Sequence, residues 1–227
     1  MSSRSEGAGP EPSIDRWEGG ASWVAHPDET MQRASHLLVD ASAPTDLVYL
    51  VDPVDIDGLR SLVDEYGSLA GIVLLLDRHT RDVEMLANSL EAPVLIPAWM
   101  SRIEETLSAP VERLGDRLGS YRVLTVVDNR LWQEAALYNP DSRVLLAPES
   151  LGTASYYRAP AERVGVHPAR RLTPPTALGE YPVEHLLTGH GPAVHDDASV
   201  AVREAISGSR SRAPSLYLNT LRDALSL

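Results

Sequence analysis

The sequence of 227 residues contains no cysteine, no phenylalanine and no lysine, so arginine supplies all 20 of its basic residues. Without cysteine there is no disulfide framework, no thiolate metal cluster and no cysteine nucleophile. The 32 acidic residues give a formal charge of −12, which repels nucleic-acid phosphates and anionic lipid. We therefore expect neither a nucleic acid nor a membrane among the partners. Strong acidity without lysine also predicts an extreme halophile, with a GC-rich genome as the alternative.

Long apolar runs are absent too, because none approaches the roughly 18 residues that span a bilayer. Residues 1–12 are polar and rich in Ser, Gly and Pro, and they lack the apolar stretch of a signal peptide. They predict a disordered tail on a cytoplasmic protein. No composition break divides residues 13–227, so we expect a single domain ending in a C-terminal helix. Its leucine stripe packs on the domain or on a second copy, which would make a homodimer.

The apolar pattern predicts alternating strands and helices with no internal repeat. Strands are expected at 22–25, 35–39, 47–51, 71–76, 93–96, 121–127, 131–138, 143–147 and 185–188. Helices are expected at 55–67, 80–90, 100–108, 196–207 and from 215, after a linker at 210–214. Titratable residues follow two of the buried strands, in segments 77–82 and 188–192. Open α/β sheets place their sites at such strand ends.

These segments resemble the motifs of the metallo-β-lactamase-fold hydrolases, in particular the glyoxalase-II-like branch. In that family a strand ends in His-x-His-x-Asp-His, a third histidine follows, a bridging aspartate ends a later strand, and a last histidine lies in Gly-His-Gly. The resemblance implies a four-layer αββα sandwich. It places the following residues in the cleft, the last of them supporting the site from behind: Asp77, His79, Arg81, Asp82, Arg130, Glu149, His190 and Asp52.

Of the family's ligand positions, only His79 and His190 keep the family's residue. Arginine has no lone pair for a cation but pairs bidentately with carboxylates. Arg81 and Arg130 bring two positive charges against the three negative charges of the carboxylates at 77, 82 and 149, so the charges nearly balance without an ion. We therefore predict arginine–carboxylate pairs in place of a metal centre, no cofactor, and a protein that binds a small molecule.

The alternative is a reduced metal site. Its mixed set of nitrogen and oxygen ligands would hold one zinc, iron or manganese ion and would come from Asp77, His79, Glu149 and His190. Water activated there would attack an ester, thioester or lactone. Whether the protein is an enzyme depends on which of the two predictions holds.

The remaining candidate residues favour ordinary structural roles. Five further histidines are expected at the surface or in structural positions, with the second and third of them also placed to line the cleft: His26, His36, His167, His185 and His195. Ser150 and Ser155 lack a Gly-x-Ser-x-Gly elbow, which argues against a serine hydrolase. No phosphate-binding glycine loop is present. The segment 156–158 favours packing over ligand contact.

Overall fold

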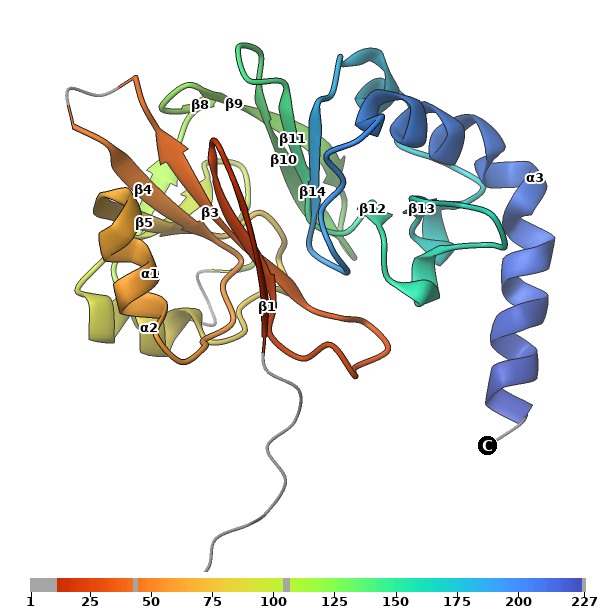
Figure 1. Ribbon diagram of the computed structural model, residues 1–227, viewed down its shortest axis with the longest axis horizontal. Helices are drawn as coiled ribbons and strands as arrows, with labels where there is room; N and C mark the ends of the chain where they lie inside the picture. The colour runs from red at the N-terminus through yellow and green to blue at the C-terminus, as the bar shows by residue number, and fades with distance from the viewer. Residues whose placement is uncertain (1–11, 43–44, 104–106, 226–227) are drawn as a thin grey trace, which may run out of the picture.

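The structure, a computed structural model, describes residues 12–42, 45–103 and 107–225, with side chains to residue 218. Two main sheets face each other (Figure 1). The larger sheet runs in the order β1 to β7. Its first four strands form an antiparallel meander and the rest are parallel. The strands are β1 Ser13–Trp17, β2 Gly20–Val24, β3 Ala34–Asp40, β4 Leu47–Val51, β5 Ser68–Val73, β6 Val94–Pro97 and β7 Val111–Leu114.

The smaller sheet has five strands in the order β14-β11-β10-β9-β8, with β14 parallel to β11. The strands are β8 Arg117–Leu118, β9 Tyr121–Asp128, β10 Gln133–Asn139, β11 Val144–Ala147 and β14 His185–Thr188. The connection from β11 to β14 holds a small ribbon and three short 3₁₀ helices. These are β12 Leu151–Gly152, β13 Gly165–Val166, η2 Ser155–Tyr157, η3 Pro168–Arg170 and η4 Thr176–Glu180.

Helices cover the outer face of each main sheet, so the layers run α, β, β, α (Figure 1). α1 (Leu59–Tyr66) and α2 (Val83–Leu90) bury leucines and valines against the larger sheet. α3 (Ala198–Leu225) buries a stripe of small apolar residues against the smaller one. A third apolar cluster joins the two inner faces. Burial on both faces explains why the central strands read as continuous apolar runs, and the predicted four-layer sandwich is confirmed.

Several predicted elements differ from the structure. The described part of segment 100–108 contains no helix, and the N–H of Ser101 there bonds the side-chain oxygen of Gln133 on the opposite sheet. The edge strands β1, β7 and β8 were not predicted from the sequence. They are short and partly exposed, and so carry little apolar signal.

The predicted linker at 210–214 is helical, and α3 continues through Pro214. The helix is held to the body on both sides of the proline, because Ser209 Oγ donates to Arg171 O at 2.9 Å and Tyr217 OH to Pro168 O at 2.8 Å. This anchoring offsets the hydrogen bond that proline cannot make. Among the helices described, none has both the length and the apolarity needed to cross a membrane.

Candidate active site

Four strand ends meet at one edge of the sandwich. β4 and β5 are parallel neighbours in the larger sheet, and β11 and β14 are parallel neighbours in the smaller one. Asp52 follows β4, and the chain leaving β5 reaches His79. Glu149 and His190 each lie two residues beyond the ends of β11 and β14. The carboxyl ends of parallel strands therefore bring these side chains from four segments to one place.

His79, Glu149 and His190 form a buried cluster at this edge, each of them at most 8% exposed. The Nε2 atoms of His79 and His190 lie 3.3 Å and 3.0 Å from the same oxygen, Glu149 Oε2. One nitrogen or oxygen from each residue lies within 4.8 Å of the others, a spacing that suits a single metal ion. Three of the predicted cleft residues are thus brought together.

The second ring nitrogen of each histidine fixes its tautomer. His190 Nδ1 lies 2.9 Å from the carbonyl oxygen of Met31, which can only accept, so Nδ1 carries the proton. His79 Nδ1 lies 3.0 Å from Asp52 Oδ2, and Asp52 Oδ1 accepts the N–H of Leu75 at 3.1 Å. An ionised carboxylate also only accepts. In the neutral rings, both Nε2 lone pairs consequently point at Glu149.

His167 has the opposite tautomer. Its Nδ1 accepts the backbone N–H of Ala169 at 3.2 Å, so the proton is on Nε2 and is donated to Glu149 Oε1, also at 3.2 Å. Burial by itself would raise the pKa of Glu149, but hydrogen bonds from His167, and from His190 and His79 when their Nε2 atoms carry protons, outweigh it and hold that pKa well below its usual range. Burial lowers the pKa of His190. Near neutral pH the cluster therefore combines an ionised carboxylate with a neutral His190 ring.

Glu134, on β10, supports Glu149 from within the smaller sheet. It is fully buried, and its carboxylate accepts the N–H groups of Glu149 and Ser150 at 3.1 Å and 2.7 Å. It also accepts Ser150 Oγ at 2.6 Å and the indole N–H of Trp132 at 3.0 Å. Sequence reasoning missed Glu134, although a lone carboxylate inside an apolar strand is a recognisable signal.

Arg81 lies at the cluster, but it does not pair with carboxylates as predicted. Its guanidinium donates to the carbonyl oxygens of Ala34 and Asp52, both at 2.6 Å, and of Gly189 at 3.1 Å. One amino group also lies 3.5 Å from His79 Nε2. Arg81 has a left-handed backbone, with φ of 34°, which aims the side chain back under the strand ends. Burial lowers the pKa of this guanidinium.

The other predicted cleft residues lie outside the cluster. Asp77 accepts the N–H of Gln133 at 3.2 Å and lies 3.2 Å from Arg102, and Asp82 accepts the N–H of Asp55 at 2.9 Å. Arg130 is exposed on the turn before β10. The predicted balance of two arginines against three carboxylates is therefore replaced by Arg81 against Asp52 and Glu149.

Tyr157 closes the cluster on the side of η2. Its ring is fully buried and stacks on His190, with ring centroids 5.4 Å apart and an interplanar angle of 25°. The ring can pack here because residue 152 is glycine. A Cβ at Gly152 would lie 2.4 Å from Cγ of the tyrosine ring. The Tyr157 hydroxyl lies near Glu149 but makes no hydrogen bond of good geometry in the described chain. Burial and the nearby charge of Glu149 raise its pKa well above the usual value.

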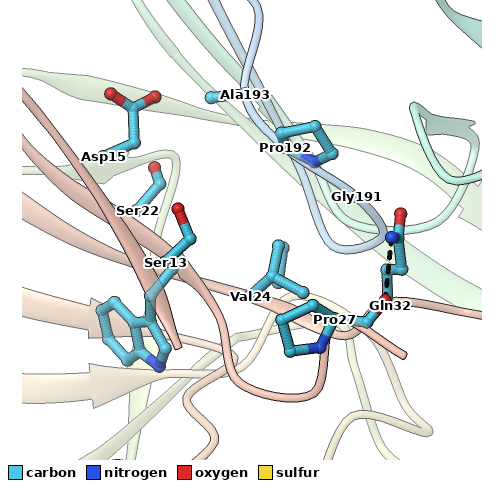
Figure 2. Close-up of a pocket in the computed structure, with 11 residues that line it drawn as sticks. Ser13, Asp15, Ser22, Val24, Pro27, Gln32, Gly191, Pro192 and Ala193 are labelled. Carbon is cyan, nitrogen blue, oxygen red and sulfur yellow. Dashed lines mark hydrogen bonds between the residues drawn. The ribbon is translucent and has the colours of Figure 1, made fainter. Parts of the chain in front are cut away.

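A pocket of about 200 Å³ lies on the other side of the segment that carries His190 (Figure 2). β1, β2 and the loop after β14 line it. Gln32 and Gly191 bound it and are joined by a hydrogen bond of 2.8 Å from the Gly191 N–H. Gly191 has φ of +90°, and a Cβ there would lie 2.4 Å from Thr153 Oγ1, so only glycine fits. His36 lies behind the site, between Ser22 Oγ at 2.8 Å and Thr188 O at 3.0 Å.

No family model and no curated protein sequence matches the chain. Solved structures do. The DIM-1 metallo-β-lactamase exposed to ceftazidime has a TM-score of 0.60 and 13% identity over 92% of this chain and 99% of that one. The metal-soaked Flv1 flavodiiron core from Synechocystis has a TM-score of 0.60 and 14% identity, and the match covers 90% of this chain and 62% of that one. TTHA1623 in a di-iron-bound form has a TM-score of 0.51 and 20% identity, and the match covers 77% of this chain and 93% of that one. The chain therefore has the metallo-β-lactamase fold.

Proposed function

We propose that the protein is a metallo-β-lactamase-fold hydrolase of an ester, thioester or lactone that uses one metal ion held by His79, Glu149 and His190. The supporting observation is that two histidine Nε2 lone pairs and an ionised carboxylate converge on one point. Three electron-rich atoms at such distances repel one another unless a cation or protons lie between them. The glyoxalase-II-like branch remains our prediction for the kind of hydrolase.

The donor set fits a single ion. Two histidines and one glutamate form a ligand set of catalytic zinc sites, which keep a further position open for water or substrate. Ligand atoms of a tetrahedral zinc site lie about 3.3 Å apart, close to the separations of 3.3 Å and 3.0 Å around Glu149 Oε2. With neutral histidines, Asp52 and Glu149 contribute −2 and Arg81 contributes +1, which leaves −1. That charge favours one divalent ion and disfavours two.

The surrounding residues would orient the ligands. Asp52 and the Met31 carbonyl hold the two rings in the tautomer that ligation needs, and His167 holds the carboxylate of Glu149. Arg81, fixed on three carbonyls, places a positive charge 3.5 Å from His79 Nε2, which disfavours a second ion. When bound, the ion would polarise a substrate carbonyl and activate water for attack.

Elemental analysis and hydrolysis test this proposal. The protein, purified without chelator, is expected to carry about one zinc, iron or manganese ion per chain and to hydrolyse p-nitrophenyl acetate. EDTA should lower both the melting temperature and the rate. A matched control is His195→Asn, at a histidine–carboxylate pair remote from the site. Metal-free protein whose melting does not respond to EDTA or added zinc would contradict the proposal.

One observation favours a second function, that of a metal-free protein binding a small molecule. The Arg81 amino group lies 3.5 Å from His79 Nε2 and offers that lone pair a proton donor in place of a cation. Arg81→Ala separates the two functions. Zinc affinity should rise if the arginine only limits metal binding. If the arginine replaces the metal, the variant should instead lose stability and gain no zinc response.

A further inference from the structure

Trp132 lies beside the site and connects it to two arginines. Its ring is 9% exposed, and its N–H is held by Glu134, the residue that also fixes Glu149. The Trp132 ring meets His167 edge-on at 5.0 Å and 85°. Arg78 Cζ lies 4.7 Å from the ring centroid and Arg170 Cζ lies 5.7 Å from it. Two guanidiniums thus lie over one indole, which contacts His167 and Glu134, the two residues that hold Glu149 in place.

These two arginines keep most of their donors free of carboxylates. Arg78 Nε forms a long ion pair with Asp77 Oδ1 at 3.7 Å, and its side chain is 51% exposed, with no hydrogen bond from its amino groups in the described chain. Arg170 donates one amino N–H to Thr173 O at 3.2 Å, while its buried Nε has no partner in the described chain. A buried N–H without an acceptor is costly, and guanidinium has five donors. An acceptor from outside the chain could instead bind the amino groups that Arg78 and Arg170 leave without a partner in the described chain.

The local charge is unusual for this molecule. The chain carries −12 overall, yet Arg102 adds a third guanidinium beside Arg78 and Arg170, because it lies 3.2 Å from Asp77 Oδ2 and donates to the backbone carbonyl of Arg130 at 2.6 Å. Asp77 is the one carboxylate paired with these arginines among the described residues, with Oδ2 shared by Arg102 and the N–H of Gln133 and Oδ1 facing Arg78. Charge self-repulsion among arginines is relieved when an anion binds between them.

We propose that Arg78 and Arg170 bind an anionic group, a carboxylate or a phosphate, on the substrate whose reacting bond lies at Glu149. The proposal rests on the hydrolase function given above and assigns its substrate class. The planar guanidinium fork matches both oxyanions bidentately, and stacking on Trp132 holds each fork before the ligand arrives. Binding energy from this remote group would place the ester at the metal centre.

Paired esters test the substrate class. The metal-loaded protein is assayed with neutral p-nitrophenyl acetate and with mono-p-nitrophenyl glutarate, which carries a free carboxylate. The ratio of kcat/KM for glutarate to that for acetate is expected to be about 10 to 100. In the double variant Arg78→Gln, Arg170→Gln the ratio should fall toward one. Arg163→Gln, at an exposed arginine before β13 that donates to the carbonyl oxygen of Asp196, is the control and should keep the ratio.

Anion binding gives a readout that needs no activity. Isothermal titration with glutarate and with inorganic phosphate is expected to show binding to the unaltered protein, at least tenfold weaker in the double variant. Tighter binding of phosphate would identify a phosphate group, and of glutarate a carboxylate. Absence of hydrolysis with anion binding intact would overturn the proposed hydrolase but not this site. Hydrolysis with a ratio near one and no anion binding would overturn the site alone.

Discussion

Two histidine–carboxylate clusters lie at opposite ends of β14, and they differ in how many protons they need. At its start, His185 Nδ1 lies 2.7 Å from His195 Nδ1, and His195 Nε2 lies 2.8 Å from Asp15. Beyond its end, His190 and His79 share one oxygen of Glu149. The side chains of His195 and Asp15 are 25% and 45% exposed, whereas those of His79, His190 and Glu149 are at most 10% exposed.

The difference shows that proximity of histidine and carboxylate is not itself a metal signal. In the cluster of His185, His195 and Asp15, one proton on each hydrogen bond satisfies both atoms, so the set is complete without a cation. In the cluster of His79 and His190, the protons are held on Nδ1 by Asp52 and the Met31 carbonyl. Their Nε2 atoms reach Glu149 without one. The partners of the far ring nitrogen therefore distinguish the two clusters.

The largest predicted effect comes from removing the carboxylate charge of each cluster in turn. Glu149→Gln removes a charged ligand, so zinc affinity should fall at least 100-fold, whereas Asp15→Asn should leave it unchanged. Zinc at about a thousand times its Kd stabilises a folded protein by about 4 kcal/mol, and that increment should vanish in Glu149→Gln. Calorimetric melting with and without zinc measures it. Equal zinc stabilisation of the two variants would contradict the assignment.

A second prediction concerns His36, which lies behind the site and has both ring nitrogens paired within the chain. Burial lowers its pKa from 6.5 to about 4. The unfolded chain therefore binds the proton first as pH falls, and the free energy of unfolding decreases between pH 6.5 and 4. The shift corresponds to about 3 kcal/mol. Urea melts across this range should show the loss. His36→Gln should flatten the profile, and exposed His26→Gln should leave it as it is.

A third, smaller effect tests the proton held on His79. Asp52→Asn keeps the shape of the side chain but removes the charge that fixes the ring, and such changes behind a ligand cost about 10- to 100-fold in metal affinity. Asp82→Asn, which alters a carboxylate that bonds only the backbone of Asp55 among the described contacts, is the matched control. Zinc titration of the two proteins against a competing chelator gives the ratio. A ratio near one would show that Asp52 has no part in positioning.

Much of the fold was predictable from the sequence because buried parallel strands appear as continuous apolar runs, and titratable residues follow the ends of these strands. The positions of His79, Glu149 and His190 follow from those strand ends. Arg81 lies at the cluster but bonds carbonyl groups, while Asp77 and Arg130 lie outside it, since where a side chain points depends on local backbone. The left-handed φ of Arg81 turns its guanidinium to carbonyl groups, and Arg130 lies on an exposed turn.

The rest of the site has no readable sequence pattern. A backbone carbonyl such as that of Met31 has the same sequence signature as any other, yet it fixes the tautomer of His190. His167 and Tyr157 come from the irregular connection between β11 and β14, where no periodicity indicates direction. Their roles arise only when the ribbon of β12 and β13 folds back over Glu149.

The smallest predicted effect is a change in the free energy of unfolding that has opposite signs for two buried tyrosines. Tyr157 buries a hydroxyl without a partner, whereas Tyr138 OH donates to Pro182 O at 3.0 Å. Removing an unsatisfied buried hydroxyl relieves a desolvation cost, and removing a paired one loses a hydrogen bond, each about 1 kcal/mol. In metal-free protein, Tyr157→Phe should therefore raise the free energy of unfolding and Tyr138→Phe should lower it, as urea melts would measure. If Tyr157→Phe lowers the free energy of unfolding once zinc is bound, the hydroxyl is left unpaired for a ligand of the site. A group bound with the metal would then be the partner that the hydroxyl lacks in metal-free protein. If Tyr157→Phe is destabilising without metal, the hydroxyl already has a partner and is not available to the site.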